Sequence, residues 1–170
     1  MDSNSIKKIL VIIVSRIGDT LLTTPAIESI SSHYKDADIT VLAHPKRQSI
    51  VKCLPFIARV GAISKYSATY RAWLLKDYDL AFVYGYDKSL ILYALRASRK
   101  VVAFKQKESE INNKLYRSVE FPTSKNMHFI DIFMTLPKSI GIQENSKRLL
   151  LSITKDEELF AKKILTRNNL

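Results

Sequence analysis

Residues 15–20 read Ser-Arg-Ile-Gly-Asp-Thr and bring one acidic residue together with several polar ones. They follow an apolar run and precede a segment with helical spacing of apolar residues. The Asp19 carboxylate could take a proton from a hydroxyl group that attacks a substrate, which is the work of a general base. Asp19 could equally cap the helix that follows, because Asp is among the preferred N-cap residues. The residue types leave both interpretations open.

Four neighbours of Asp19 are candidate ligand contacts, namely Ser15, Arg16, Gly18 and Thr20. Hydroxyl and guanidinium groups can hydrogen-bond a polar ligand, and a glycine lets a ligand approach the backbone closely. Solvated loops have the same composition, so the segment alone does not decide. It has a single glycine and no Gly-Lys-Ser/Thr sequence, which excludes the dinucleotide-binding and P-loop motifs at this turn.

A second candidate site is a basic and aromatic stretch between residues 65 and 76. It contains Lys65, Tyr66, Tyr70, Arg71, Trp73 and Lys76. The Arg71 guanidinium can bind a carboxylate or phosphate through two parallel hydrogen bonds, and Lys76 adds a further positive charge. An ordinary solvated helix face has the same pattern, so this interpretation stays open too.

Lys88 and His128 are isolated candidates. Lys88 comes after Tyr86 and Asp87, which follow an apolar run, and His128 precedes a helical pattern. A basic side chain at either place can contact a polar ligand. The histidine can instead have the structural role of capping its helix.

The composition limits the class of protein. The chain has 170 residues, is 46% hydrophobic and shows no internal repeat, which is typical of one globular domain. Cys53 is the single cysteine, so a disulfide framework and a cysteine-based zinc cluster are excluded, and we expect a reducing compartment such as the cytoplasm. The apolar stretch 9–14 is too short for a signal-peptide core or a membrane span. The net charge of +11 predicts an anionic partner, whether nucleic acid, phosphorylated lipid or a membrane surface.

Apolar runs alternate with helix-like segments along most of the chain. Strands are expected at residues 8–14, 39–43, 58–63, 79–85 and 99–104, and helices at residues 20–32, 48–54, 66–76 and 88–98. The first strand has no polar alternation, which indicates a strand of a parallel sheet that is covered on both faces. The alternation predicts an open, doubly wound parallel sheet of the Rossmann-like α/β class.

The last third of the chain fits this scheme less regularly. Residues 105–125 are polar and predict a loop with one helical turn, and residues 127–140 predict a helix that ends near Gly141. Residues 147–153 predict a strand. Residues 154–170 predict a final helix, with Thr154 and Glu157 spaced as a capping box.

Several segments resemble glycosyltransferase family 9, the bacterial heptosyltransferases of lipopolysaccharide core assembly. The similar segments are Gly18-Asp19, LLTTPAIESI, YKDADITVL, Arg59-Val60, DYDLAFVYGYDKS and HFIDIFMTLPKSIGI. Together they span nearly the whole chain, and Gly-Asp followed by Thr-x-Pro-Ala at this spacing is fairly specific. The sequence departs from the family pattern at Tyr86, Asp87 and Lys88, which bears on the identity of the acceptor.

The resemblance implies a fold of the GT-B type, in which two Rossmann-like domains face a cleft. Residues 1–150 would form the N-terminal, acceptor-binding domain, and residues 151–170 a helix that leads to a donor-binding domain missing from this chain. The donor would be a nucleotide sugar, ADP-heptose by analogy, bound mainly by that second domain. Neither a metal nor another cofactor is expected. Alone, the chain would be incomplete and inactive.

The resemblance also implies residue roles. Asp19 would be the base that deprotonates the acceptor hydroxyl, and Arg71 and Lys76 would hold an anionic lipopolysaccharide core acceptor. Further substrate contacts would come from Ser15, Arg16, Gly18, Thr20, Lys88 and His128. The protein would be cytoplasmic, with peripheral contact at the inner face of the membrane that presents its acceptor.

A noncatalytic anion-binding or nucleic-acid-binding α/β module is the alternative function. The net charge of +11 and the mixture of basic and aromatic side chains between residues 65 and 76 motivate it. The sequence contains no recognised nucleic-acid-binding motif, and no specific nucleic-acid partner is expected.

Overall fold

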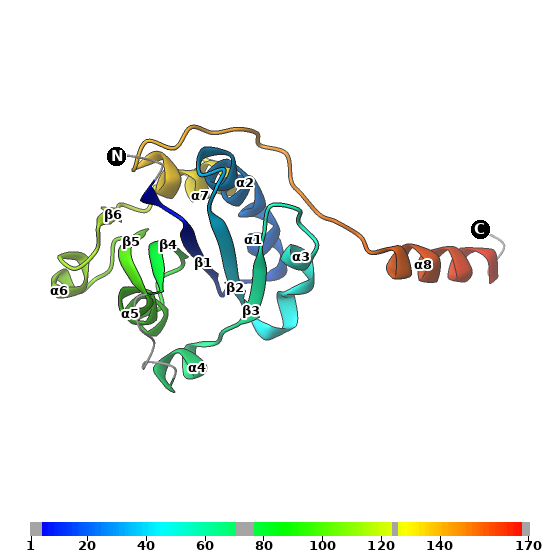
Figure 1. Ribbon diagram of the computed structural model, residues 1–170, viewed down its shortest axis with the longest axis horizontal. Helices are drawn as coiled ribbons and strands as arrows, with labels where there is room; N and C mark the ends of the chain where they lie inside the picture. The colour runs from blue at the N-terminus through cyan, green and yellow to red at the C-terminus, as the bar shows by residue number, and fades with distance from the viewer. Residues whose placement is uncertain (1–4, 71–76, 124–125, 168–170) are drawn as a thin grey trace.

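Six parallel strands form a single sheet in the order β3-β2-β1-β4-β5-β6 (Figure 1). The computed structural model describes residues 5–70, 77–123 and 126–167. The strands are β1 (Lys8–Ile13), β2 (Asp38–Ala43), β3 (Arg59–Ala62), β4 (Tyr78–Tyr84), β5 (Ser98–Phe104) and β6 (Arg117–Val119). This order is that of a doubly wound sheet, so the predicted fold class is confirmed.

Strand β1 is the centre of the sheet because it pairs with a neighbour on each side. It is in parallel register with β2, Ile9 opposite Ile39, and with β4, Ile9 opposite Leu80. Residues 9–13 are buried throughout. A strand with paired edges and two covered faces has no exposed position, which explains its continuous run of Ile, Val and Leu.

Helices cover both faces of the sheet. On one face α2 (Thr24–His33), α3 (Ser49–Lys52) and α7 (Phe129–Lys138) pack over Ile9, Val11 and Ile13. On the other face α4 (Lys65–Tyr70), α5 (Lys88–Ala97) and α6 (Ser109–Asn112) pack over Leu10 and Ile12. Alternate residues of β1 therefore serve two separate hydrophobic layers, as the two-residue period of a strand requires.

The predicted helix at residues 20–32 is two helices, α1 (Ile17–Leu22) and α2, which are separated at Thr23. The break follows from Pro25, which has no backbone N–H to donate to the carbonyl of Leu21. The Thr24 hydroxyl donates to that carbonyl instead, at 2.8 Å. The first helix also begins three residues earlier than predicted, so the Gly18-Asp19 pair lies inside it.

The predicted strand at residues 147–153 is wrong. These residues are extended but pair with no strand in the part of the chain that the structure describes. The segment runs over α2 instead, where the backbone N–H of Leu150 donates to the Thr24 hydroxyl at 3.0 Å (Figure 1). Leu149, Leu151 and Ile153 are exposed while Leu150 packs on the core, so the alternating pattern reflects a chain crossing a helix.

The predicted polar loop at residues 105–125 contains a sixth strand that the sequence analysis missed. Strand β6 has three residues and pairs with β5, Ala103 opposite Ser118. Its residues Arg117, Ser118 and Val119 carry little apolar signal because β6 is an edge strand. The predicted helical turn in this loop is confirmed as α6.

The final predicted helix is confirmed as α8 (Lys155–Arg167), with its capping box. The Glu157 carboxylate accepts from the backbone N–H of Thr154 at 2.8 Å, and the Thr154 hydroxyl accepts from the N–H of Glu157 at 3.2 Å. Helix α8 lies apart from the sheet and its helices (Figure 1). Within the described ranges, no helix has both the length and the apolar character needed to cross a membrane.

Thr24→Val should lower the free energy of unfolding by about 1 kcal/mol, because it leaves the N–H of Leu150 without an acceptor. It should also speed hydrogen exchange at that amide. Thr24→Ser keeps the hydroxyl and should behave like the wild type in both measurements. Unchanged exchange at Leu150 in Thr24→Val would show that the segment is held in another way.

Candidate active site

The carboxyl ends of β1 and β4 lie side by side in the sheet, and the chain leaves them toward opposite faces. After β1 it enters α1 and α2, and after β4 it enters α5. Such a divergence opens a crevice, which is where doubly wound proteins bind ligands. A cavity of about 180 Å³ lies there, and its polar lining includes Ser15, Asp19 and Thr23.

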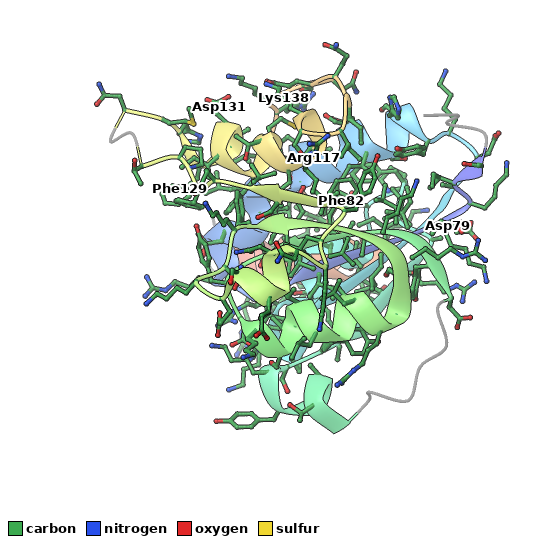
Figure 2. The ribbon with its side chains drawn as sticks, turned by 90° about the vertical axis from the view of Figure 1, so that its left-hand side faces the viewer. Asp79, Phe82, Arg117, Phe129, Asp131 and Lys138 are labelled. Atoms are coloured by element: carbon green, nitrogen blue, oxygen red, sulfur yellow. The ribbon has the colours of Figure 1, made fainter. Side chains whose placement is uncertain are left out.

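Most of the cavity wall is aromatic, and we call it the aromatic cavity. Its six rings come from β4, β5, α7 and two connecting segments: Tyr84, Tyr86, Phe104, Phe121, Phe129 and Phe133. Figure 2 shows Phe129 at the side of the molecule opposite Asp79, which accepts hydrogen bonds at the start of β1. The cavity is therefore at the carboxyl edge of the sheet.

The rings form two groups, and the rings within each group are in contact with one another. The centroid of Phe121 lies 5.1 Å from that of Phe104 and 5.4 Å from that of Tyr86. In the second group, the centroid of Phe133 lies 5.8 Å from Tyr84 and 6.0 Å from Phe129. These spacings are those of mutually stabilising aromatic pairs, so the wall is held in shape before a ligand enters.

Asp19 is not the N-cap of α1, but its side chain takes part in the capping box of this helix, so the capping interpretation is confirmed in part. The N-cap residue is Arg16, and Asp19 lies in the first turn, three positions later. Its Oδ2 atom accepts one long hydrogen bond, 3.4 Å, from the backbone N–H of Arg16. A carboxylate has room for about four such bonds, so Asp19 keeps lone pairs for another partner in the cavity.

The other predicted residues of the first loop fall into three positions. Ser15 lines the aromatic cavity. Arg16, the N-cap of α1, and Gly18, in the first turn of that helix, are exposed beside it. Thr20 is fully buried, and its hydroxyl donates to the carbonyl of Arg16 at 3.0 Å. This hydrogen bond stabilises the turn from Arg16 to Thr20. The side chains of Ser15 and Asp19 line the cavity together.

Tyr84 carries an unusual hydroxyl group. The side chain is 3% exposed and lines the aromatic cavity, and its hydroxyl has no hydrogen-bond partner among the described residues. Burial raises the pKa of Tyr84 far above its usual value, so the hydroxyl stays protonated. A buried hydroxyl without a partner costs free energy, which a ligand that pairs with it would recover.

Tyr86 is positioned by the residue before it. Gly85 has a φ of 146°, a backbone conformation that side chains with a Cβ rarely adopt. The turn places Tyr86 against Phe104, with ring centroids 5.9 Å apart. Partial burial raises the pKa of Tyr86 to about 12, so it too acts as a neutral hydrogen-bonding group.

Lys88 lies outside the aromatic cavity. It begins α5 and forms an ion pair with Glu108 at 3.4 Å. Its neighbour Asp87 caps α5, accepting from the N–H of Ser89 at 3.1 Å, and pairs with Lys65 at 2.8 Å. Desolvation raises the pKa of Asp87, but hydrogen bonds from Lys65 and Ser89 outweigh it and lower the pKa overall.

His128 is the N-cap of α7, and its Nδ1 atom accepts from the backbone N–H of Ile130 at 3.2 Å. The capping interpretation is thus confirmed, while a ligand contact stays a prediction. Arg71 and Lys76 lie outside the described residues. Across the ranges that the structure describes, no group of three or more His, Cys, Asp and Glu side chains could hold a metal ion.

No pattern in the sequence marks the aromatic wall as part of a site. Its members come from five separate segments, and each alone reads as a strand end or a core residue. Tyr86 stood out only as a departure from the family pattern. The position of two of the rings could have indicated the site. Tyr84 and Phe104 end neighbouring parallel strands, so they lie at the same edge of the sheet.

The sequence matches no protein-family profile and no curated protein. Solved structures are similar in fold. A glycosyl transferase family 9 protein from Veillonella parvula superposes on all of this chain with a TM-score of 0.84 and 16% identity. The fold is that of one half of a GT-B glycosyltransferase. This chain covers 51% of the Veillonella protein.

Two proteins of Escherichia coli are similar as well. Heptosyltransferase WaaC, solved with ADP, has a TM-score of 0.65 and 19% identity over 84% of this chain. ADP-heptose lipopolysaccharide heptosyltransferase II has a TM-score of 0.67 and 19% identity over 94% of this chain. The chain spans about half the length of each, 50%. The resemblance to glycosyltransferase family 9 therefore holds at the level of the fold.

The Asp87–Lys65 ion pair predicts a pH dependence of stability. Because folding lowers the pKa of Asp87, the pair stabilises the protein above the unfolded pKa of about 3.9 and is lost as pH falls through the folded value. Asp87→Asn can still accept from Ser89, so it removes the charge alone. The variant should melt below the wild type at about pH 6, and the two should converge as pH falls through the folded pKa of Asp87.

Lys65→Met removes the other partner and should lower the melting temperature in the same pH range. A difference between wild type and Asp87→Asn that persists unchanged at low pH would contradict this account of the pair.

Proposed function

We propose that this chain is the acceptor-binding half of an inverting glycosyltransferase that transfers a heptose from a nucleotide sugar to an acidic lipopolysaccharide core acceptor. One observation carries the proposal. The Asp19 carboxylate lies in an open cavity at the carboxyl ends of β1 and β4, with a single long hydrogen bond to its own chain. The fold shared with heptosyltransferases supports it.

The chemistry assigned to Asp19 is general-base catalysis. The acceptor hydroxyl gives its proton to the Asp19 carboxylate as its oxygen forms a bond to the anomeric carbon of the donor. The bond from that carbon to the diphosphate breaks, and the nucleoside diphosphate leaves with the electron pair. Attack from the side opposite the leaving group inverts the anomeric centre.

The donor is assigned to a second domain. We propose that residues 1–150 are the acceptor-binding domain and that residues 151–170 lead to a donor-binding domain, which would hold the nucleotide sugar, ADP-heptose by analogy. Helix α8 supports this division, because it buries none of its residues and exposes Leu159, Phe160 and Leu165. Exposed apolar side chains of this kind suit contact with another protein domain. The acceptor lipid would bring the enzyme to the inner face of the cytoplasmic membrane.

A noncatalytic module that binds anions or nucleic acids is the second candidate. The net charge of +11 favours it, since such a field attracts any polyanion. The aromatic cavity with a carboxylate in it speaks against it, because nucleic-acid grooves place basic side chains beside their stacking rings.

The isolated chain should bind a Kdo-bearing lipid acceptor but should not transfer heptose to it from ADP-heptose, because the donor-binding domain is required for the reaction. Titration calorimetry and a product assay measure the two properties. Single-stranded oligonucleotides of unrelated sequence are the control, and they should bind more weakly than the acceptor at physiological salt. Oligonucleotide binding that falls steeply with salt, without acceptor binding, would favour the second candidate.

Asp19→Asn in the complete two-domain enzyme should lower turnover on the order of a hundredfold or more, the usual scale for loss of a general base. Folding should be unaffected, because the amide oxygen of Asn can still accept from the N–H of Arg16. Asp19→Ala should lose turnover equally and melt within a few degrees of the wild type. Near-normal turnover in Asp19→Asn would remove Asp19 from the mechanism.

A further inference from the structure

The aromatic cavity differs in chemistry from the basic surface that the net charge suggests. Among the described residues that line it, Asp19 is the charged one, and there is no lysine or arginine. The faces of aromatic rings also carry partial negative charge. A carboxylate or phosphate in the cavity would therefore meet repulsion from Asp19 and from the ring faces, with no cation among the described lining residues to offset it.

A neutral sugar ring has the complementary chemistry. One face of a pyranose is a layer of C–H groups with partial positive charge, which contact the faces of aromatic rings favourably. The hydroxyl groups at its edge can donate to a carboxylate. Phe129 is 48% exposed and Tyr86 is 51% exposed, so both present ring surface that an entering ligand can cover.

The buried hydroxyl of Tyr84 is a second and independent indication of a polar ligand. It lines the same cavity and has no hydrogen-bond partner among the described residues. A phenol hydroxyl both donates and accepts, so it pairs readily with a sugar hydroxyl. An entirely apolar ligand would leave Tyr84 unpaired.

The size of the cavity limits the occupant to about one ring. Sites that bury drug-sized ligands have volumes of roughly 300–1,000 Å³, whereas this cavity has about 180 Å³. A nucleoside diphosphate is too large for it, and its phosphates would approach the Asp19 carboxylate. A single monosaccharide unit at the end of a longer acceptor fits both the volume and the charge.

We propose that the aromatic cavity binds the sugar ring that carries the accepting hydroxyl, and that this ring is an uncharged hexose or heptose. The acidic groups of the acceptor then lie on other rings, outside the cavity. This inference rests on the proposed function, because it takes the cavity to be the acceptor site. It excludes a carboxylated sugar as the ring that receives the heptose.

Saturation-transfer NMR titrations of the 170-residue chain test the proposal without any donor. The probes are the methyl glycosides of mannose and of a manno-heptose, which are neutral, the methyl glycoside of Kdo, which is carboxylated, and ADP. The neutral glycosides should bind, with the strongest transfer to ring C–H protons. The Kdo glycoside should bind at least about fivefold more weakly, and ADP should not displace the neutral glycosides.

Variants locate the binding. Phe129→Ala should weaken binding of the neutral glycosides about five- to tenfold, the scale of one lost aromatic contact. Phe129→Tyr keeps the ring and should restore it. Tyr86→Ala is a second test should Phe129→Ala fail to fold. Tyr116→Ala is the matched control, because Tyr116 is an aromatic residue that is 43% exposed and does not line the cavity.

The proposal is overturned if no neutral glycoside binds, if the Kdo glycoside binds as well or better, if ADP displaces the neutral glycosides, or if the cavity variants bind like Tyr116→Ala. Failure of the proposed function gives a different result. Neutral glycosides would then bind in the cavity, but the complete enzyme would transfer no sugar. Conversely, transfer directly onto a Kdo ring would leave the transferase in place and remove this inference.

Discussion

The parallel pairing of β1 with both β2 and β4 is the constraint on which the rest of the structure depends. Because β1 is paired on both edges, the chain must wind outward in two directions, and the connections that follow β1 and β4 leave on opposite faces. That divergence opens the cavity at the carboxyl ends of the two strands. The central position of β1 also explains why residues 9–13 are all buried, since each packs in a hydrophobic layer and lies beside neighbouring strands. Changes in this strand would therefore disturb the fold and the site together.

The same geometry gives the cavity two kinds of wall. The segment after β1, which includes the first turn of α1, contributes the polar groups Ser15 and Asp19, while the ends of β4 and β5 and helix α7 contribute aromatic rings. A carboxylate beside apolar rings is less screened than one on an open surface, so a hydrogen bond to it from a ligand hydroxyl would be stronger there. The hydrogen bond from the Thr20 hydroxyl to the carbonyl of Arg16 stabilises the polar wall, and the contact between Phe121 and Phe104 stabilises the aromatic wall. A carboxylate and a stacking surface thus line the same cavity.

The sequence predicts the fold well and the site in part. Strands β1, β2, β4 and β5 stand out because buried parallel strands are continuous apolar runs, whereas β6 is a three-residue edge strand with no such signal. The extended segment 147–153 has the short apolar run of a strand, yet its contact with α2 depends on the Thr24 hydroxyl, which no local pattern reveals. Asp19 was found because it lies in a short motif. The rings around it come together only in the folded chain, and the apolar pattern of each segment predicts Tyr84 and Phe133 to be ordinary core residues.

A structure of the chain with a bound acceptor oligosaccharide tests the central claim most directly, namely that the aromatic cavity receives the accepting sugar beside its base. The account predicts an uncharged ring against Phe129 and Tyr86, with one hydroxyl oxygen within about 2.6–3.2 Å of the Asp19 carboxylate. The acidic sugars should lie outside the cavity. An acceptor bound elsewhere on the basic surface, with the aromatic cavity empty and Asp19 without contact to it, would contradict the account.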